Sequence, residues 1–343
     1  MQAGHHLIGI QPHGGLLYYR IAESGCMQPS GDVNIWRLRQ GFNGLKTYFD
    51  LWGRRPQQGK TASNEAREIH ALFAALDAGR AVERPALQKA AFLLLGLAPG
   101  QYIRMMQRHA ASFDNALTPQ YRELLPRVDF SLPPRSELLF HLINPELYVW
   151  VPPATEQPRR LLVCFATKKN TFNMPRPIAH YVLARLGIGL MYVGNRPQFD
   201  PSAGFLGRGI EYSAELIRKV ASDLGFDLLY GLGTSLGGYA ACRYAAPLEF
   251  RRVLNFSGAT IAPTPEIARE RSLGRLVKGY PRDRILSVLS KTDPTDQKIL
   301  RDYEASGFDT PREWVDSTAH GTFSAAVIEG RLPGYLSWLL ADD

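Results

Sequence analysis

The chain has 343 residues, of which 45% are hydrophobic and 21% charged, as expected of a globular protein with a sizeable core. The net charge of +8 favours anionic partners, but the arginines are scattered without interleaved aromatic residues, so we expect no nucleic-acid partner. The apolar run Ala90–Pro99 is about half the length of a membrane-spanning helix. No basic segment followed by an apolar one opens the sequence. We therefore expect no membrane span and a cytoplasmic location.

The cysteines and the early histidines suggest neither a disulfide nor a metal site. The chain has three widely separated cysteines, Cys26, Cys164 and Cys242. Their odd number and wide spacing argue against a disulfide framework, and the last two lie in apolar or small-residue segments typical of buried thiols. Three histidines near the start, His5, His6 and His13, are irregularly spaced and have no acidic partners. We predict no cofactor and no metal.

Residues 1–125 predict an accessory region made of a β-hairpin followed by helices. Leu7–Ile10 and Leu16–Ile21 favour β-strands and are separated by a proline and a glycine pair. Ser63–Leu76 begins with a capping serine and acidic residues and then repeats apolar residues at intervals of three and four, which predicts an amphipathic helix. Two further segments give a helical signal, Pro85–Leu95 and Pro99–Phe113. None of these segments carries recognisable chemistry.

Residues 126–343 predict a separate domain in which short apolar strands alternate with helices. The expected strands are Leu147–Val151, Leu161–Ala166, Gly189–Val193, Leu228–Leu232, Val253–Phe256, Ile285–Leu289 and Trp314–Val315. The expected helices are Ile178–Leu186, Ile210–Leu224, Leu236–Ala246, Glu266–Leu273, Asp296–Ala305 and Phe323–Leu340. This alternation predicts an α/β fold with a doubly wound, mostly parallel sheet. Such sheets bind ligands at the carboxyl ends of their strands.

The strongest motif is G-x-S-x-G, which lies between an expected strand and an expected helix. Gly233, Ser235 and Gly237 form it, and two glycines would let the strand turn sharply into the helix. The turn would hold Ser235 in a strained conformation with its hydroxyl projecting from the sheet. The backbone N–H of Leu236 would lie at a helix N-terminus, where negative charge is favoured.

The segment Tyr230–Tyr239 resembles the nucleophile elbow of the α/β-hydrolase superfamily. The resemblance covers about residues 128–343, and it does not extend to the first 125 or so. It implies a catalytic order of serine, acid and histidine along the chain. Of the eight histidines only His320 follows Ser235, and it lies in a small-residue loop before the last expected helix, where the superfamily carries its base.

The superfamily carries its acid in the loop after the penultimate strand. Asp293 and Asp296 both lie in that loop, after Ile285–Leu289. We favour Asp293. Asp296 remains the alternative, although it could instead cap the following helix, a role for which Thr295 competes.

A second donor for the oxyanion is expected from the loop after Leu161–Ala166. The His-Gly sequence that the superfamily often carries there is missing, so Thr167 and Lys168 are both candidates. Several basic residues of the loops that follow strands are candidates for binding an anionic group of the substrate: Lys168, Lys169, Arg176 and Arg196.

These residues predict a serine hydrolase that cleaves an ester, in the first place a carboxylic ester, through an acyl-enzyme with Ser235, His320 and Asp293 as the triad. The substrate expected is a small-molecule or glycan-type acyl ester, with an anionic form favoured by the basic loops. Two alternatives remain open: an acyltransferase that uses the same triad, and a non-catalytic interaction protein on this fold.

Overall fold

A computed structural model describes residues 160–168, 171–174, 176–194, 208–259, 270–317 and 320–341. It also describes the shorter segments 5–10, 16–21, 27–30, 71–72, 74–80, 82–83, 86, 123–128, 140–144, 147–150, 152, 199–200 and 204–205. The chain divides into two compact units, one of residues 1–134 with 175–182 and the other of residues 135–174 with 183–343. Within the described segments, no helix combines the length and the apolar character needed to cross a membrane.

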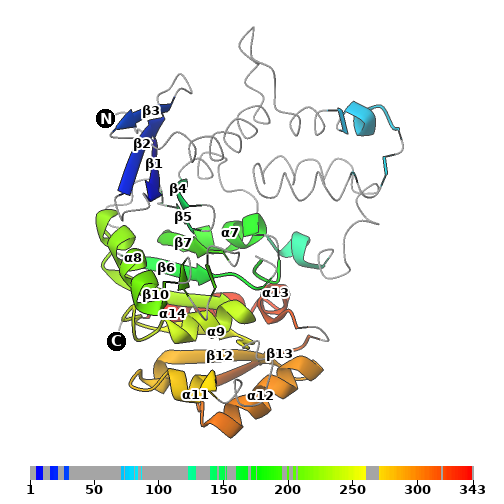
Figure 1. Cartoon of the computed structure of the whole chain (residues 1–343). Coiled ribbons are helices and arrows are strands. Elements are labelled where there is room, and N and C mark those ends of the chain that lie inside the picture. Colours follow the sequence, from blue (N-terminus) through cyan, green and yellow to red (C-terminus); the bar gives the residue numbers. More distant parts are fainter. Residues whose placement is uncertain are drawn as a thin grey trace. The chain divides into compact units, whose positions relative to one another are not determined.

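The first unit contains a small antiparallel sheet, drawn in blue in Figure 1. Its strands are β1 (His5–Ile10), β2 (Leu16–Ile21) and β3 (Met27–Ser30), in the order β1-β2-β3. The pair β1–β2 corresponds to the predicted hairpin. This unit also contains the 3-10 helix η1 (Leu125–Arg127) and most of helix α7 (Arg176–Ala184).

Part of the predicted helix Ser63–Leu76 is described; its last helical residue is Asp77, and Gly79, with a φ of 67°, lies in the turn that follows. The predicted helices Pro85–Leu95 and Pro99–Phe113 lie outside the described residues, residue 86 excepted. The division of the chain into an accessory region and a catalytic domain at residue 125 stays a prediction.

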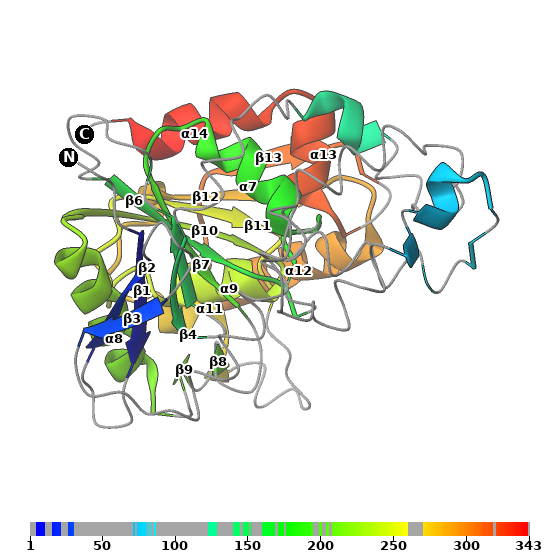
Figure 2. The same ribbon diagram turned by 90° about the horizontal axis from the view of Figure 1, so that it is seen from above.

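The second unit is built on an eight-stranded sheet in the order β13-β12-β11-β10-β6-β7-β5-β4 (Figures 1 and 2). The strands are β4 (Phe140–Asn144), β5 (Leu147–Trp150), β6 (Arg160–Phe165), β7 (Gly189–Val193), β10 (Leu228–Thr234), β11 (Val253–Phe256), β12 (Ile285–Ser290) and β13 (Arg312–Val315). Only β5 pairs antiparallel with its neighbours β4 and β7. All seven predicted strands are present, and β4 is an eighth that the sequence did not predict. Two short strands, β8 (Phe199–Asp200) and β9 (Gly204–Phe205), pair separately.

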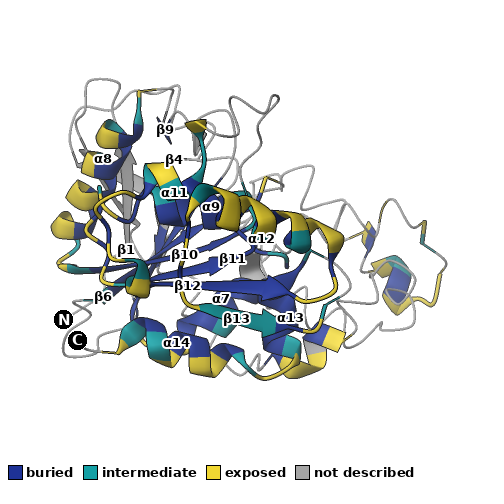
Figure 3. Cartoon of the chain, turned by 90° about the horizontal axis from the view of Figure 1, so that it is seen from below, coloured by how far each residue is buried: buried dark blue, intermediate teal, exposed yellow. Residues whose placement is uncertain are grey.

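Helices cover both faces of this sheet, as predicted. Figure 3 shows α8 (Ile210–Asp223), α9 (Leu236–Arg243), α11 (Leu273–Leu276) and α12 (Pro294–Ser306) on one side, and α13 (Thr322–Ile328) and α14 (Leu332–Leu340) on the other. A short 3-10 helix, η3 (Arg282–Arg284), precedes β12. Because both faces are covered, every residue of β7 and β12 is buried, which explains why the strands are continuous apolar runs.

Two of the predicted helices differ from the structure. The expected single helix Phe323–Leu340 is divided into α13 and α14. Gly330 has a φ of 70°, outside the helical region, and Pro333 lies in the first turn of α14, where proline is favoured. The expected helix Glu266–Leu273 lies mostly outside the described residues, and α11 begins at Leu273.

Candidate active site

Ser235 occupies the bend between β10 and α9. Its φ of 53° and ψ of −122° place a non-glycine residue in a sparsely populated backbone region. Two backbone bonds hold the bend: the Ser235 N–H donates to the Phe256 carbonyl at 2.8 Å, and the Ser235 carbonyl accepts from the Tyr239 N–H at 3.1 Å. The residue as a whole is partly exposed.

The two glycines of the motif each allow another backbone segment to approach closely, and the segment differs between them. A Cβ on Gly233 would overlap the carbonyl of Gly237, so Gly233 allows the bend to close as predicted. A Cβ on Gly237 would instead overlap the carbonyl of Phe165 at the end of β6. Gly237 therefore lets the start of α9 approach the end of β6, which brings the two expected sources of oxyanion donors together.

His320 lies against the Ser235 hydroxyl. Its Nε2 is 2.8 Å from Ser235 Oγ, and a quarter of the side chain, 25%, is exposed. A side chain of the segment after β6 binds the loop that carries His320: Asn173 Nδ2 donates to the His320 carbonyl at 3.2 Å. Asn173 itself has a left-handed backbone, with a φ of 58°, which asparagine tolerates better than most residues. The two side chains expected to act together are thus within hydrogen-bonding distance.

The other imidazole nitrogen faces Asp296. His320 Nδ1 lies 2.6 Å from Asp296 Oδ1, and the Asp296 side chain is fully buried. The second oxygen, Oδ2, accepts the Ser290 N–H at 2.6 Å and the Ser257 hydroxyl at 2.6 Å. These hydrogen bonds replace the water that a buried carboxylate loses. Since a carboxylate only accepts, the arrangement assigns the proton of the neutral imidazole to Nδ1 and leaves Nε2 free to accept from Ser235.

The sequence-based preference for Asp293 as the partner of His320 is therefore wrong. Asp293 is the N-cap of α12, and its Oδ1 accepts the Asp296 N–H at 3.0 Å. The helix begins at Pro294, so the preceding residue caps it, and Asp296 in the first turn reaches back to the end of β12. Asp-Pro is itself a signal for a cap followed by the first helical residue, and it would have identified Asp293 as the cap.

The two candidates for the second oxyanion donor differ in their backbone bonds. The Thr167 N–H donates to the Thr171 carbonyl at 2.8 Å, so it is already engaged and does not fit the predicted role. The Lys168 N–H has no backbone acceptor among the described residues. Leu236 is the first residue of α9, and its N–H has no acceptor within the helix. Leu236 and Lys168 thus stay the candidates for the two oxyanion donors.

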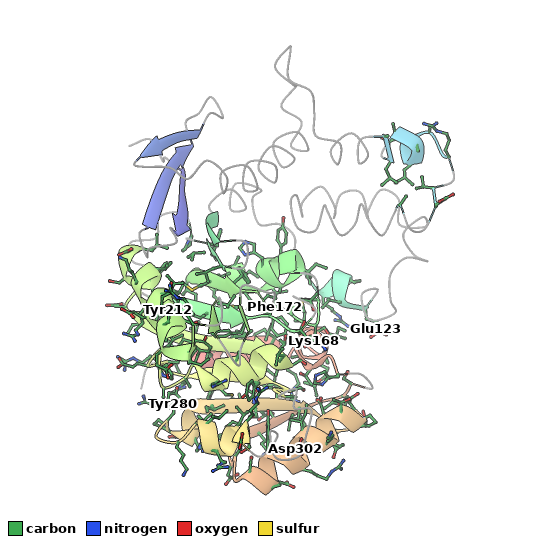
Figure 4. The ribbon with its side chains drawn as sticks, viewed as in Figure 1. Glu123, Lys168, Phe172, Tyr212, Tyr280 and Asp302 are labelled. Carbon is green, nitrogen blue, oxygen red and sulfur yellow. The ribbon has the colours of Figure 1, made fainter. Side chains whose placement is uncertain are left out.

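The predicted anion-binding residues are only partly described. The Lys168 side chain is exposed, whereas Phe172 on the same loop is fully buried (both are labelled in Figure 4). Lys169 and Arg196 lie outside the described residues. Arg176 is the first residue of α7, and its side chain lies outside them too.

Asp293, Asp296 and His320 also offer three potential metal ligand atoms within 4.8 Å of one another. Hydrogen bonds already engage these groups, as described above. The Asp296 oxygens bind His320, Ser257 and Ser290, while Asp293 Oδ1 accepts the N–H of Asp296 in the first turn of α12. Hydrogen bonding explains the cluster, and we assign no metal to it.

The described cysteines do not compete with Ser235 as nucleophiles. Cys164 and Cys242 are fully buried, and burial raises the pKa of both thiols far above its ordinary range. Because the thiolate is the nucleophilic form, both are inert in the folded protein. The prediction of two buried thiols is confirmed.

The strand order, the helices on both faces and the strand–serine–helix bend define an α/β-hydrolase fold. No protein-family model and no curated protein matches the chain in sequence. Solved structures that resemble it include TT1662 from Thermus thermophilus, with 17% identity, a TM-score of 0.40 and coverage of 57% of this chain and 94% of that one.

Two further solved structures give similar values. A hyperthermophilic esterase from the archaeon Pyrobaculum calidifontis has 16% identity and a TM-score of 0.37, with coverage of 56% of this chain and 76% of the other. XC6422 from Xanthomonas campestris, described as an α/β serine hydrolase without a lid, has 16% identity and a TM-score of 0.38, with coverage of 57% and 90%.

Proposed function

We propose that the protein is a serine hydrolase that cleaves carboxylic esters through an acyl-enzyme on Ser235. The observation that carries the proposal is the continuous set of hydrogen bonds from Asp296 through His320 to Ser235, with distances of 2.6 and 2.8 Å. A serine hydroxyl needs a base within hydrogen-bonding reach to become nucleophilic, and His320 Nε2 fulfils this condition.

The proposed reaction has two halves. In the first, Ser235 Oγ attacks the ester carbonyl while its proton passes to His320 Nε2, and the resulting imidazolium protonates the departing alcohol. In the second, water attacks the acyl-enzyme and gives a proton to His320; the bond between the acyl group and Ser235 Oγ then breaks, His320 returns the proton to Oγ, and the acid product leaves. In both, Asp296 holds the imidazole and stabilises its charged form. The amides of Leu236 and Lys168 would donate to the oxyanion of each tetrahedral intermediate.

The substrate that we propose is a small-molecule or glycan-type acyl ester that carries an anionic group. The exposed side chain of Lys168, on the loop after β6, supports this choice, since the backbone N–H of the same residue is a proposed oxyanion donor. Lys169, Arg176 and Arg196 are proposed to contribute to the same preference.

Fluorophosphonate labelling combined with an ester panel tests the proposal. We expect the native protein to be labelled on Ser235, the Ser235→Ala variant to remain unlabelled, and activated p-nitrophenyl esters to be hydrolysed by the native protein alone. Adding alcohol and sugar acceptors to the same assay distinguishes hydrolysis from acyl transfer, because transfer would give a new ester in place of the free acid. A folded native protein that is neither labelled nor active on any ester would contradict the proposal.

A further inference from the structure

A second serine binds the Asp296 carboxylate on the oxygen that His320 does not use. Ser257 directly follows β11 and is 1% exposed. Its Oγ lies 2.6 Å from Asp296 Oδ2, and because a carboxylate only accepts, the Ser257 hydroxyl donates. Ser257 belongs to no recognisable motif, and in sequence it lies 39 residues from Asp296.

Counting protons extends this contact to a third loop. Ser257 has one hydroxyl proton, and it is donated in the hydrogen bond to Asp296. Thr322 Oγ1 lies 3.0 Å from Ser257 Oγ, so in this pair Thr322 is the donor. Thr322 is the first residue of α13, directly after the loop of His320. The chain of donors therefore connects the segments that follow β11, β12 and β13 around one carboxylate.

The backbone around Ser257 is strained and firmly held. Its φ is 50°, a left-handed value for a non-glycine residue, which persists only where neighbouring contacts enforce it. The next carbonyl, that of Gly258, accepts from the Tyr303 hydroxyl of α12 at 2.5 Å. The following amide, that of Ala259, donates to the carbonyl of Ser235 at 3.3 Å. The same short loop thus contacts the backbone of the proposed nucleophile and the side chain of the acid.

We propose that Ser257 is a positioning residue, which holds the Asp296 carboxylate in the orientation that keeps His320 Nε2 directed at Ser235. With the Ser257 hydroxyl and the Ser290 N–H both bound to Oδ2, the carboxylate cannot rotate without losing two donors. Small displacements of a catalytic group are costly in rate. The effect on turnover rests on the proposed function, whereas the effect on the hydrogen bond between Asp296 and His320 can be measured without it.

Ser257→Ala tests the proposal, with Ser213→Ala as the matched control. Alanine keeps the Cβ, so the backbone strain at this position stays and the hydroxyl alone is removed. Ser213, which lies on α8, is also fully buried, and its hydroxyl donates to the Gly209 carbonyl at 2.8 Å. In Ser257→Ala we expect kcat to fall about tenfold or more with KM within about twofold of native. Ser213→Ala should keep the native kcat.

The pH profile gives a readout that a merely structural role would not change. A carboxylate that loses a donor holds the imidazolium more strongly, so the acid limb of kcat in Ser257→Ala should move to higher pH. Ser257→Cys keeps a weak donor, and its kcat should lie between those of the alanine variant and the native protein. It also replaces the alanine variant if that variant does not fold.

The downfield proton resonance of His320 Nδ1–H measures the hydrogen bond directly. We expect it to move in Ser257→Ala and to stay at its native position in Ser213→Ala. A native kcat, an unchanged acid limb and an unmoved resonance in Ser257→Ala would overturn the proposal. A native protein inactive on all esters would contradict the proposed function instead, and the resonance alone would then decide on Ser257.

Discussion

Replacing the two neighbouring aspartates by asparagine should separate the carboxylate that serves His320 from the one that caps α12. In Asp296→Asn, the amide oxygen should take the position of Oδ2, because the Ser290 N–H and the Ser257 hydroxyl both donate there. The NH2 group would then face His320 Nδ1. That nitrogen would have to accept, so the proton would move to Nε2, which could no longer take the proton of Ser235.

The expected loss is large because the variant imidazole has the wrong tautomer. In other serine enzymes with this arrangement, the equivalent substitution lowers kcat by about 10⁴, or roughly 5 kcal/mol of transition-state stabilisation. Asp293→Asn keeps the side-chain oxygen that accepts the Asp296 N–H, and asparagine is as good an N-cap as aspartate. We expect its kcat to stay within about fivefold of native and its stability within about 0.5 kcal/mol.

Steady-state hydrolysis of p-nitrophenyl acetate, at a pH where the native rate no longer rises with pH, measures both variants against the native protein. Fluorophosphonate titration gives the concentration of reactive sites, and circular dichroism verifies folding. A loss in Asp293→Asn equal to or greater than that in Asp296→Asn would refute the assignment of roles. So would an Asp296→Asn variant of native activity.

Three further predictions follow from single contacts. Gly237→Ala places a Cβ against a backbone carbonyl of β6 and should lower the free energy of unfolding by about 2 kcal/mol. In Gly334→Ala, in α14, the added Cβ contacts nothing, so the free energy of unfolding should rise by about 0.5 kcal/mol. Urea titrations measure both variants. Asn173→Gly removes the donor to the His320 carbonyl but tolerates the left-handed φ, and kcat should fall about three- to tenfold; a native kcat would contradict this. Burial lowers the pKa of His180 to about 3 from the usual 6.5. Below pH 6.5 the histidine is protonated in the unfolded state but stays neutral in the folded state. The free energy of unfolding therefore falls by up to about 1.4 kcal/mol for each pH unit below 6.5, and His180→Gln should reduce this dependence on pH.

The sheet could be predicted from the sequence because its strands are buried on both faces. Runs such as Leu161–Ala166 are continuously apolar for this reason, and the bend at Ser235 is encoded locally by glycines on either side. The division between α13 and α14 was missed, although Gly330 and Pro333 mark it, because the apolar pattern continues across the break.

Other parts of the site depend on contacts between distant segments, which the sequence does not display. Asp293 and Asp296 lie three residues apart at the start of α12, and only the direction of each side chain distinguishes a cap from the partner of His320. Thr167 was excluded as a donor by a backbone bond to Thr171, which depends on how the loop folds. Ser257 could not have been found, since its contact with Asp296 joins the loops after two different strands.

Capture of the acyl-enzyme tests the central claim most directly. The native protein is mixed with excess p-nitrophenyl acetate, quenched with acid within milliseconds to seconds, digested and analysed by peptide mass spectrometry. Acetyl on Ser235, formed in a burst of nitrophenol equal to the active sites and absent from Ser235→Ala, is the predicted result. Nitrophenol release without any acyl group on Ser235 would contradict the account. So would acylation of another residue in the Ser235→Ala variant at the native rate.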